Sequence, residues 1–231
     1  MPRRFVMNPK RAPDQPSAAP RGLKSAAQDG FAIGSTKGIL GFIFLLLVIY
    51  GLLAAPWPGV QGAYSRFYMG AGNWAFGSFG SKGEVHFLPL AKPTGLSDIE
   101  VVTKIRGARV EGWSPHSSRM MGYLPTVEVV ALVLATPIPW RRRWKALLCG
   151  LIICQAFIAL RILICLVHWF SADRPWQLFY PGRFWGDVLT GTQEIVNVSP
   201  TLSFVAPVFI WIVVTFRRAD WEAALTKFQA P

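Results

Sequence analysis

Long apolar runs are the feature that most restricts how this chain can fold. A helix needs about 20 apolar residues to cross the hydrocarbon core of a bilayer. Three runs have close to that length, and they are Gly38 to Ala55, Ala146 to Phe170 and Ser199 to Phe216. The first and last are uncharged, and only Gln155, Arg161 and His168 interrupt the middle one. Together with a hydrophobic content of 52%, the runs predict an integral membrane protein.

A fourth run, Gly122 to Trp140, carries Glu128 and three prolines. The prolines stand close to its two ends, where a helix tolerates them. We therefore predict an all-α integral membrane bundle of four transmembrane helices with a small extracytoplasmic antiparallel β-unit. The predicted helices occupy residues 38–55, 122–140, the later part of 141–170, and 199–216.

Basic residues predict the orientation of these helices, because Lys and Arg in short flanking segments resist translocation. They collect in residues 1–37, in the turn "WRRRWK" that opens 141–170, and in the tail 217–231. All three segments then face the cytoplasm of a bacterial inner membrane. The net charge of +12 indicates contact with anionic membrane lipids and not with nucleic acid. Residues 1–37 are poor in large apolar residues and are expected to form a mobile basic arm.

The extracytoplasmic segment 56–121 changes character partway. Its first part is dense in Gly and aromatic residues, which favours the membrane interface and a short amphipathic helix from Val60 to Phe76. The runs "EVHFLPL", "DIEVVTKI" and "ARVEGW" follow and predict short antiparallel strands. The second outer segment, 171–198, is again aromatic-rich. The two segments either roof a cavity or only anchor the protein at the interface.

Ionisable residues inside the predicted helices are candidate functional groups. At a rise of about 1.5 Å per residue, Glu128 lies about 13 Å above the cytoplasmic turn and Arg161 about 25 Å above it. Glu128 is therefore expected to meet Gln155, or to stay protonated, and not to pair with Arg161. It either links helices or relays protons.

The sequence "PHSSR" reaches the same level as Arg161 at the outer rim. Its residues His116, Ser117, Ser118 and Arg119 could converge there with Arg161, or Arg161 could extend to the outer headgroups. The chain has no phosphate-binding glycine loop, no HExxH and no paired CxxC. We accordingly expect no cofactor and no metal.

These features together resemble the exosortase/archaeosortase family of membrane transpeptidases. In that family a Cys-Ser-Gly-like motif opens one helix, a basic cytoplasmic hairpin follows, and an Arg stands toward the outer end of the next helix. Here Ser118 precedes Arg161 by 43 positions, and the resemblance covers residues 114–170. For the family's third catalytic residue, the counterparts would be Arg183 or His168.

This chain departs from the family at the nucleophile, because "HSSRMMGY" contains no cysteine. If the protein is an enzyme, Ser117 or Ser118 would be the nucleophile, with His116 as base and Arg161 stabilising an oxyanion. We favour an exosortase-like protein that binds or helps to sort extracytoplasmic protein segments without cleaving them. Arg119 and Arg161 could hold a carboxylate, and Glu128 and Gln155 are further binding candidates.

Two other classes of function remain open from the sequence. One is a structural or assembly subunit of a larger membrane complex, whose partners would be other membrane or extracytoplasmic proteins. The other is a transporter with Glu128 and Gln155 on the transport path, which four helices without inverted repeats make less favourable.

Overall fold

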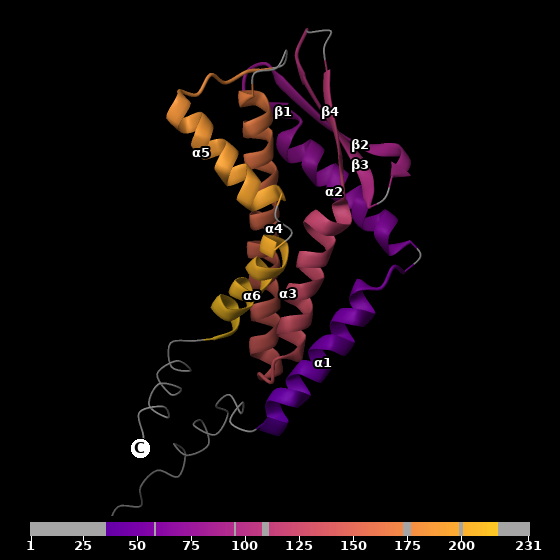
Figure 1. Cartoon of the computed structure of the whole chain (residues 1–231). Helices are drawn as coiled ribbons and strands as arrows, with labels where there is room; N and C mark the ends of the chain where they lie inside the picture. The colour runs from indigo at the N-terminus through magenta and orange to yellow at the C-terminus, as the bar shows by residue number, and fades with distance from the viewer. Residues whose placement is uncertain are drawn as a thin grey trace, which may run out of the picture. The chain divides into compact units, whose positions relative to one another are not determined.

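The computed structural model describes residues 36–57, 59–94, 96–107, 111–172, 177–198 and 201–216. Within these ranges, six α-helices pack with a four-stranded antiparallel sheet (Figure 1). The prediction of an all-α four-span bundle is therefore wrong. The fold is mixed α/β, and among the described helices one is long and apolar enough to cross a membrane, or two if a bent pair counts as one span. The predicted tail, and the predicted arm up to residue 35, lie outside the described residues.

Of the four predicted spans, the one in 141–170 is the helix that is long and apolar enough, and the other three fall short by themselves. Helix α3 (Leu124–Ala135) has 12 residues, because Thr136 turns to an extended conformation just before Pro137, and the residue before a proline disfavours helix. Seven of its residues are buried, so it is a core helix with little surface for lipid. Helix α6 (Thr201–Thr215) contains an internal proline, Pro207. Helix α1 (Thr36–Ala54) is apolar but falls just short of a full span.

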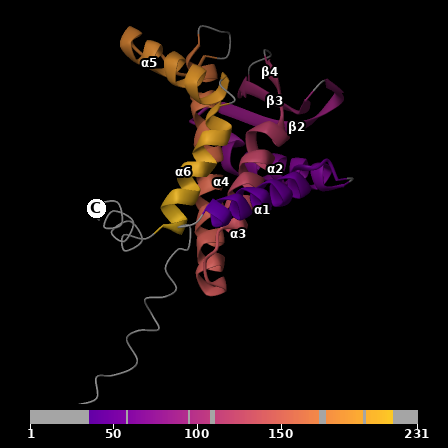
Figure 2. The same cartoon turned by 60° about the horizontal axis from the view of Figure 1, so that its bottom comes forward.

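Helix α4 (Trp140–Ser171) is the longest element, and helices α3, α5 and α6 pack against it. Its 32 residues correspond to about 48 Å at the rise of an α-helix. Helices α3 and α6 pack against α4 and against each other, and α1 packs against α3 (Figures 1 and 2). Helix α5 (Arg183–Gln193) packs on α4 and continues into a π-helical turn, η2 (Glu194–Val198).

The sheet is a meander in the order β1-β2-β3-β4. Its strands are β1 (Ser78–Phe79), β2 (Gly83–Thr94), β3 (Ser97–Ile105) and β4 (Glu111–His116). Residues on alternating positions, such as Phe87 and Val101, pair across the strands and face the core. Gly80 has a φ of 64° in the turn between β1 and β2, where a residue with a side chain would be strained.

Helix α2 (Val60–Phe76) has the bounds expected from the sequence and packs against β2. The side chain of Asn73 on this helix hydrogen-bonds to the backbone of β2, as a neighbouring strand would. The Asn73 side chain donates from Nδ2 to the Phe87 carbonyl at 3.0 Å and accepts the Phe87 N–H at 2.8 Å. Because both backbone groups are paired, this part of the sheet edge is closed.

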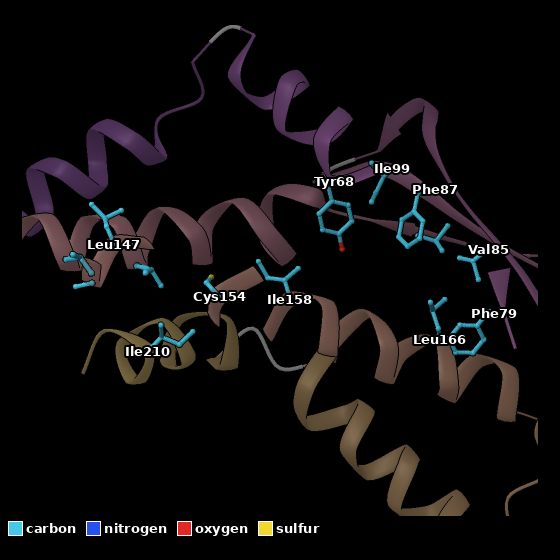
Figure 3. Packing of buried hydrophobic residues seen from close by; sticks show 14 of the residues in the cluster. Tyr68, Phe79, Val85, Phe87, Ile99, Leu147, Cys154, Ile158, Leu166 and Ile210 are labelled. Carbon is cyan, nitrogen blue, oxygen red and sulfur yellow. The ribbon is translucent and has the colours of Figure 1, made fainter. Parts of the chain in front are cut away.

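The buried core joins the sheet to the helices (Figure 3). Near the sheet, Tyr68 of α2 contacts Phe87 of β2 edge-on, and Phe79 of β1 stacks on Phe170 of α4 with ring centroids 5.2 Å apart. Farther along α4, Cys154 and Ile158 belong to the same cluster. The sheet therefore does not form a core of its own but rests on α2 and α4, as its small size requires.

Candidate functional site

A cavity of about 360 Å³ lies where α2, the start of β3 and the turn after β4 meet. We call it the Ser118 cavity. It is lined by Gln61, Gly62, Tyr64, Ser65, Leu96, Ser97, Asp98, Ser118, Arg119 and Tyr123. Its volume falls at the lower end of the range of about 300–1,000 Å³ that is typical of ligand sites.

The wall of the cavity after β4 is a π-helical turn, η1 (Arg119–Tyr123). Ser117 starts this turn, since its Oγ accepts the N–H of Met120 at 3.2 Å, as an N-terminal cap does. Gly122 lets α2 approach closely, because a Cβ at this position would lie 2.5 Å from the Tyr64 hydroxyl oxygen. Such π turns occur frequently at functional sites.

Asp98 fixes the position of Ser118. The Asp98 carboxylate accepts the Ser118 backbone N–H at 2.7 Å through Oδ1 and the Ser118 hydroxyl at 2.5 Å through Oδ2. A hydroxyl bond to carboxylate of this length is of the strong, charge-assisted kind. Ser118 is only 2% exposed, so its hydroxyl is committed to Asp98 and is shielded from solvent.

Two other residues of the cavity hold the end of α1. The Arg119 guanidinium donates from Nη2 to the Ala54 carbonyl at 3.0 Å, and the Tyr123 hydroxyl donates to the Leu53 carbonyl at 2.6 Å. The last carbonyls of a helix have no partner within the helix and carry partial negative charge. Arg119 therefore has a fixed orientation at the wall of the cavity.

The two charges of the cavity, Asp98 and Arg119, do not neutralise each other. Among the described residues, the ion pairs lie on the sheet around Glu84 and Lys104, and none joins Asp98 to Arg119. Tyr64, one of the two tyrosines in the wall, adds no charge. Burial raises the pKa of Tyr64 to about 12.

Among the described residues, His116 is hydrogen-bonded to neither Ser117 nor Ser118, whose hydroxyl oxygens have other partners. Its imidazole packs edge-on against Trp169 of α4, with ring centroids 5.3 Å apart. Its Nδ1 is buried and has no hydrogen-bond partner among the described residues. Burial lowers the pKa of His116, and backbone contacts with Pro115 and Ser114 oppose that shift. The lowered pKa favours the neutral imidazole, and the structure shows no hydrogen-bonded His–Ser pair among the described residues.

Arg161 is also apart from the cavity. It is 4% exposed, its Nη1 donates to the Ser203 hydroxyl of α6 at 2.7 Å, and its guanidinium lies 5.9 Å from the ring centre of Phe157. Arg161 does not line the Ser118 cavity. The five residues expected at the outer rim are thus divided: Ser118 and Arg119 line the cavity, Ser117 caps a turn, and His116 and Arg161 have other partners.

The remaining predicted binding residues lie on α3 and α4. Gln155 donates from Nε2 to Thr126 Oγ1 at 3.0 Å, and Thr126 in turn donates to the Gly122 carbonyl at 2.7 Å. Glu128 has a buried carboxylate oxygen, Oε2, with no hydrogen-bond partner among the described residues. The expected contact of Gln155 is thus made with Thr126 instead of Glu128.

Sequence reasoning missed the residues that complete the cavity, above all Asp98, Tyr64 and Tyr123. Asp98 stands at the start of a predicted strand, where an acidic residue is common and marks no site. Its contact with Ser118 spans 20 positions, and no local pattern predicts such a pairing. For Tyr64 and Tyr123, the aromatic-rich composition pointed only to the membrane interface.

The described residues contain no group of three or more His, Cys, Asp or Glu side chains that could hold a metal ion. The polar groups of the Ser118 cavity are instead one carboxylate, one guanidinium, hydroxyls and an amide. This arrangement can bind a polar ligand through hydrogen bonds and charge. Comparison with known proteins finds no matching family model, no matching curated protein and no matching solved structure.

Proposed function

We propose that this protein is an exosortase-like protein of a bacterial cytoplasmic membrane that binds the end of an extracytoplasmic protein segment and does not cleave it. The single observation that carries the proposal is the Ser118 cavity, in which Arg119 offers guanidinium donors and Ser118 is already bonded to Asp98. Arg119 would hold a carboxylate, because guanidinium binds carboxylate in a two-point fork.

The exposure of α4 supports the membrane location. Only 33% of its most apolar window is buried, whereas the core helix of a soluble protein is mostly buried. Large apolar side chains such as Leu148, Ile152 and Leu160 are 51–63% exposed. An apolar surface of this kind indicates contact with lipid or with a partner. The basic turn Arg141 to Arg143 would face the cytoplasm.

Binding is favoured over cleavage by the state of Ser118. A serine nucleophile needs a general base and an open approach to the substrate. Here the hydroxyl donates to a carboxylate that also accepts the backbone N–H of the same residue. His116 is engaged with Trp169. The cavity therefore offers recognition groups but no assembled histidine–serine pair.

The test uses the purified full chain in mild detergent with fluorescent peptides that carry a free C-terminal carboxylate. We expect saturable binding that Arg119→Gln weakens at least tenfold, and no peptide products by mass spectrometry after prolonged incubation. A covalent acyl adduct on Ser117 or Ser118 would overturn the non-catalytic part. Absence of binding by every peptide, with a folded protein, would overturn the proposal as a whole.

One observation favours a second candidate, a subunit of a larger membrane complex. Helix α1 packs on α3 and exposes apolar residues at helical spacing, since Leu40, Phe44 and Leu47 are 62%, 70% and 63% exposed. A partner helix would cover this face as well as lipid would. Native mass spectrometry after extraction from the source membrane distinguishes the two, because constant stoichiometric partners indicate a subunit.

A further inference from the structure

The Ser118 cavity contains opposite charges that are not paired with each other. Asp98 and Arg119 both line it, and no ion pair joins them among the described residues. Their described hydrogen bonds are to neutral groups, Ser118 for Asp98 and the Ala54 carbonyl for Arg119, so each could still bind an opposite charge on a ligand. A ligand with one positive and one negative group would satisfy both residues at once.

Each of the two residues retains capacity for a ligand. A carboxylate offers about four acceptor positions, and the described partners of Asp98 use two of them, both through Ser118. A guanidinium has five N–H donors, and the bond that the structure gives Arg119 uses one, on Ala54. These existing bonds also fix the orientation of each group, which reduces the entropy lost on binding.

We propose that the cavity selects segments whose last residue is basic, with the terminal carboxylate on Arg119 and the basic side chain on Asp98. This inference rests on the proposed function and specifies its ligand. The volume of about 360 Å³ suits a ligand at the small end of the usual range, such as the last residue of a segment. Gln61, Ser65 and Ser97 supply donors and acceptors for the adjoining peptide group.

A phosphoethanolamine headgroup of a membrane lipid also has one negative and one positive group. The peptide is the better match, because an amide and several hydroxyls line the cavity beside the charges, and a peptide group uses both donors and acceptors. The headgroup is therefore kept as an outcome of the test.

The experiment compares three peptides that differ only at the last residue, using fluorescence anisotropy with the full chain in detergent. One ends in lysine with a free carboxylate, one in lysine amide, and one in norleucine with a free carboxylate. We expect the first to bind at least tenfold more tightly than either of the others. Asp98→Asn should weaken the lysine peptide at least tenfold and leave the norleucine peptide within twofold.

The Asp98→Asn variant is informative because asparagine keeps an acceptor for Ser118 and approximately the same shape. Arg119→Lys serves as the second variant, since it retains the positive charge but not the two-point fork, and it should weaken both free-carboxylate peptides. Circular dichroism melting confirms that both variants are folded. The difference between the lysine and norleucine peptides on the unmodified chain needs no variant at all.

Three outcomes contradict the inference in different ways. Equal binding of the lysine and norleucine peptides with free carboxylates, with weaker binding of the lysine amide, overturns the selection of a basic end and leaves the proposed binding function standing. Absence of binding by all three, and by other free C-termini, overturns the proposed function itself. Displacement of the lysine peptide by nanodiscs of phosphatidylethanolamine, but not of phosphatidylglycerol, overturns the peptide ligand in favour of the lipid headgroup.

Discussion

Ser118 gives both of its donors to one carboxylate, that of Asp98, over distances of 2.7 Å from the backbone nitrogen and 2.5 Å from the hydroxyl oxygen. The two residues are 20 positions apart, so this contact ties the beginning of β3 to the chain just after β4. It closes the end of the sheet against η1 and shapes one wall of the Ser118 cavity. Stability and the proposed ligand recognition therefore depend on the same pair.

The substitution Ser118→Ala should lower the free energy of unfolding by about 1.5–3 kcal/mol, because it removes a hydrogen bond to a charged group. The backbone N–H bond to Asp98 would remain. Combined with Asp98→Ala, which removes the acceptor altogether, the loss should be clearly less than additive, since both changes remove the same contact. Denaturation in detergent measures the free energy of unfolding of the unmodified protein, the two single variants and the double variant. Ser78→Ala, at an exposed position of β1, is the matched control, and a fully additive cycle would contradict the coupling.

Gly122 should not tolerate alanine. A Cβ there would lie 2.5 Å from the Tyr64 hydroxyl oxygen and 3.1 Å from a ring carbon of Tyr68, and overpacking of this kind costs about 1–3 kcal/mol. Adding Tyr64→Phe should recover part of the loss in thermal stability, because the closest atom is then absent. Gly70→Ala on α2 meets nothing within 4 Å and should instead stabilise by about 0.5–1 kcal/mol. Equal behaviour of the two glycines would contradict the packing at η1.

The sequence allowed the local elements to be predicted much better than their assembly. The runs that contain Val85, Phe87, Ile99 and Val101 form β2 and β3 in antiparallel pairs, because period-two alternation is a local signal. The bounds of α2 also agree with the sequence. The four-span bundle failed because hydropathy does not distinguish a buried core helix from a lipid-facing one. Helix α3 is as apolar as a membrane-spanning helix, but most of its residues are buried inside the protein.

The candidate site was predicted only in part, and for a related physical reason. Counting the rise along two helices gives the depth of Ser118 and Arg161 but not the direction of their side chains. Arg161 points to Ser203 on α6, an element whose position relative to α4 no local pattern predicts. The Asp98 carboxylate comes from the sheet, which the predicted bundle treated as an appendage.

Asn73 should be important for the edge of the sheet. Its side chain pairs with both backbone groups of Phe87, each bond contributing about 0.5–1.5 kcal/mol. Asn73→Ala should therefore destabilise the protein by about 1–3 kcal/mol and speed hydrogen exchange at the Phe87 amide. Asn73→Asp keeps the acceptor for the Phe87 N–H but loses the donor to the carbonyl. Hydrogen exchange at the Phe87 amide should therefore be slower in Asn73→Asp than in Asn73→Ala. Unchanged exchange in Asn73→Ala would contradict the capping role.

The free energy of unfolding should decrease at mildly acidic pH because of the titration of His116. Burial lowers its pKa in the folded state, so on acidification the unfolded chain takes up the proton first, below about pH 6.5. The stabilisation is present above that value and decreases as pH falls toward the folded pKa, by at most about 1.4 kcal/mol per pH unit. Denaturation between pH 7.5 and 5.5 should show this slope, and His116→Asn should flatten it. Glu84 titrates in a lower window, because its hydrogen bond to Arg106 lowers its pKa.

A charged substitution on the exposed face of α4 should show whether the protein is a membrane protein or a soluble one. Ile152 is 60% exposed and lies about 18 Å along the helix from Trp140, near the centre of a bilayer if α4 crosses it. Ile152→Arg should then cost about 3–4 kcal/mol of insertion free energy and reduce the membrane-inserted fraction in a translocon assay. Leu88→Arg, at a 44% exposed position of β2, is the matched control and should leave insertion unchanged. On a water-exposed helix, both substitutions would change stability by no more than about 0.5 kcal/mol, so indifference of insertion to Ile152→Arg would exclude lipid as the medium around α4.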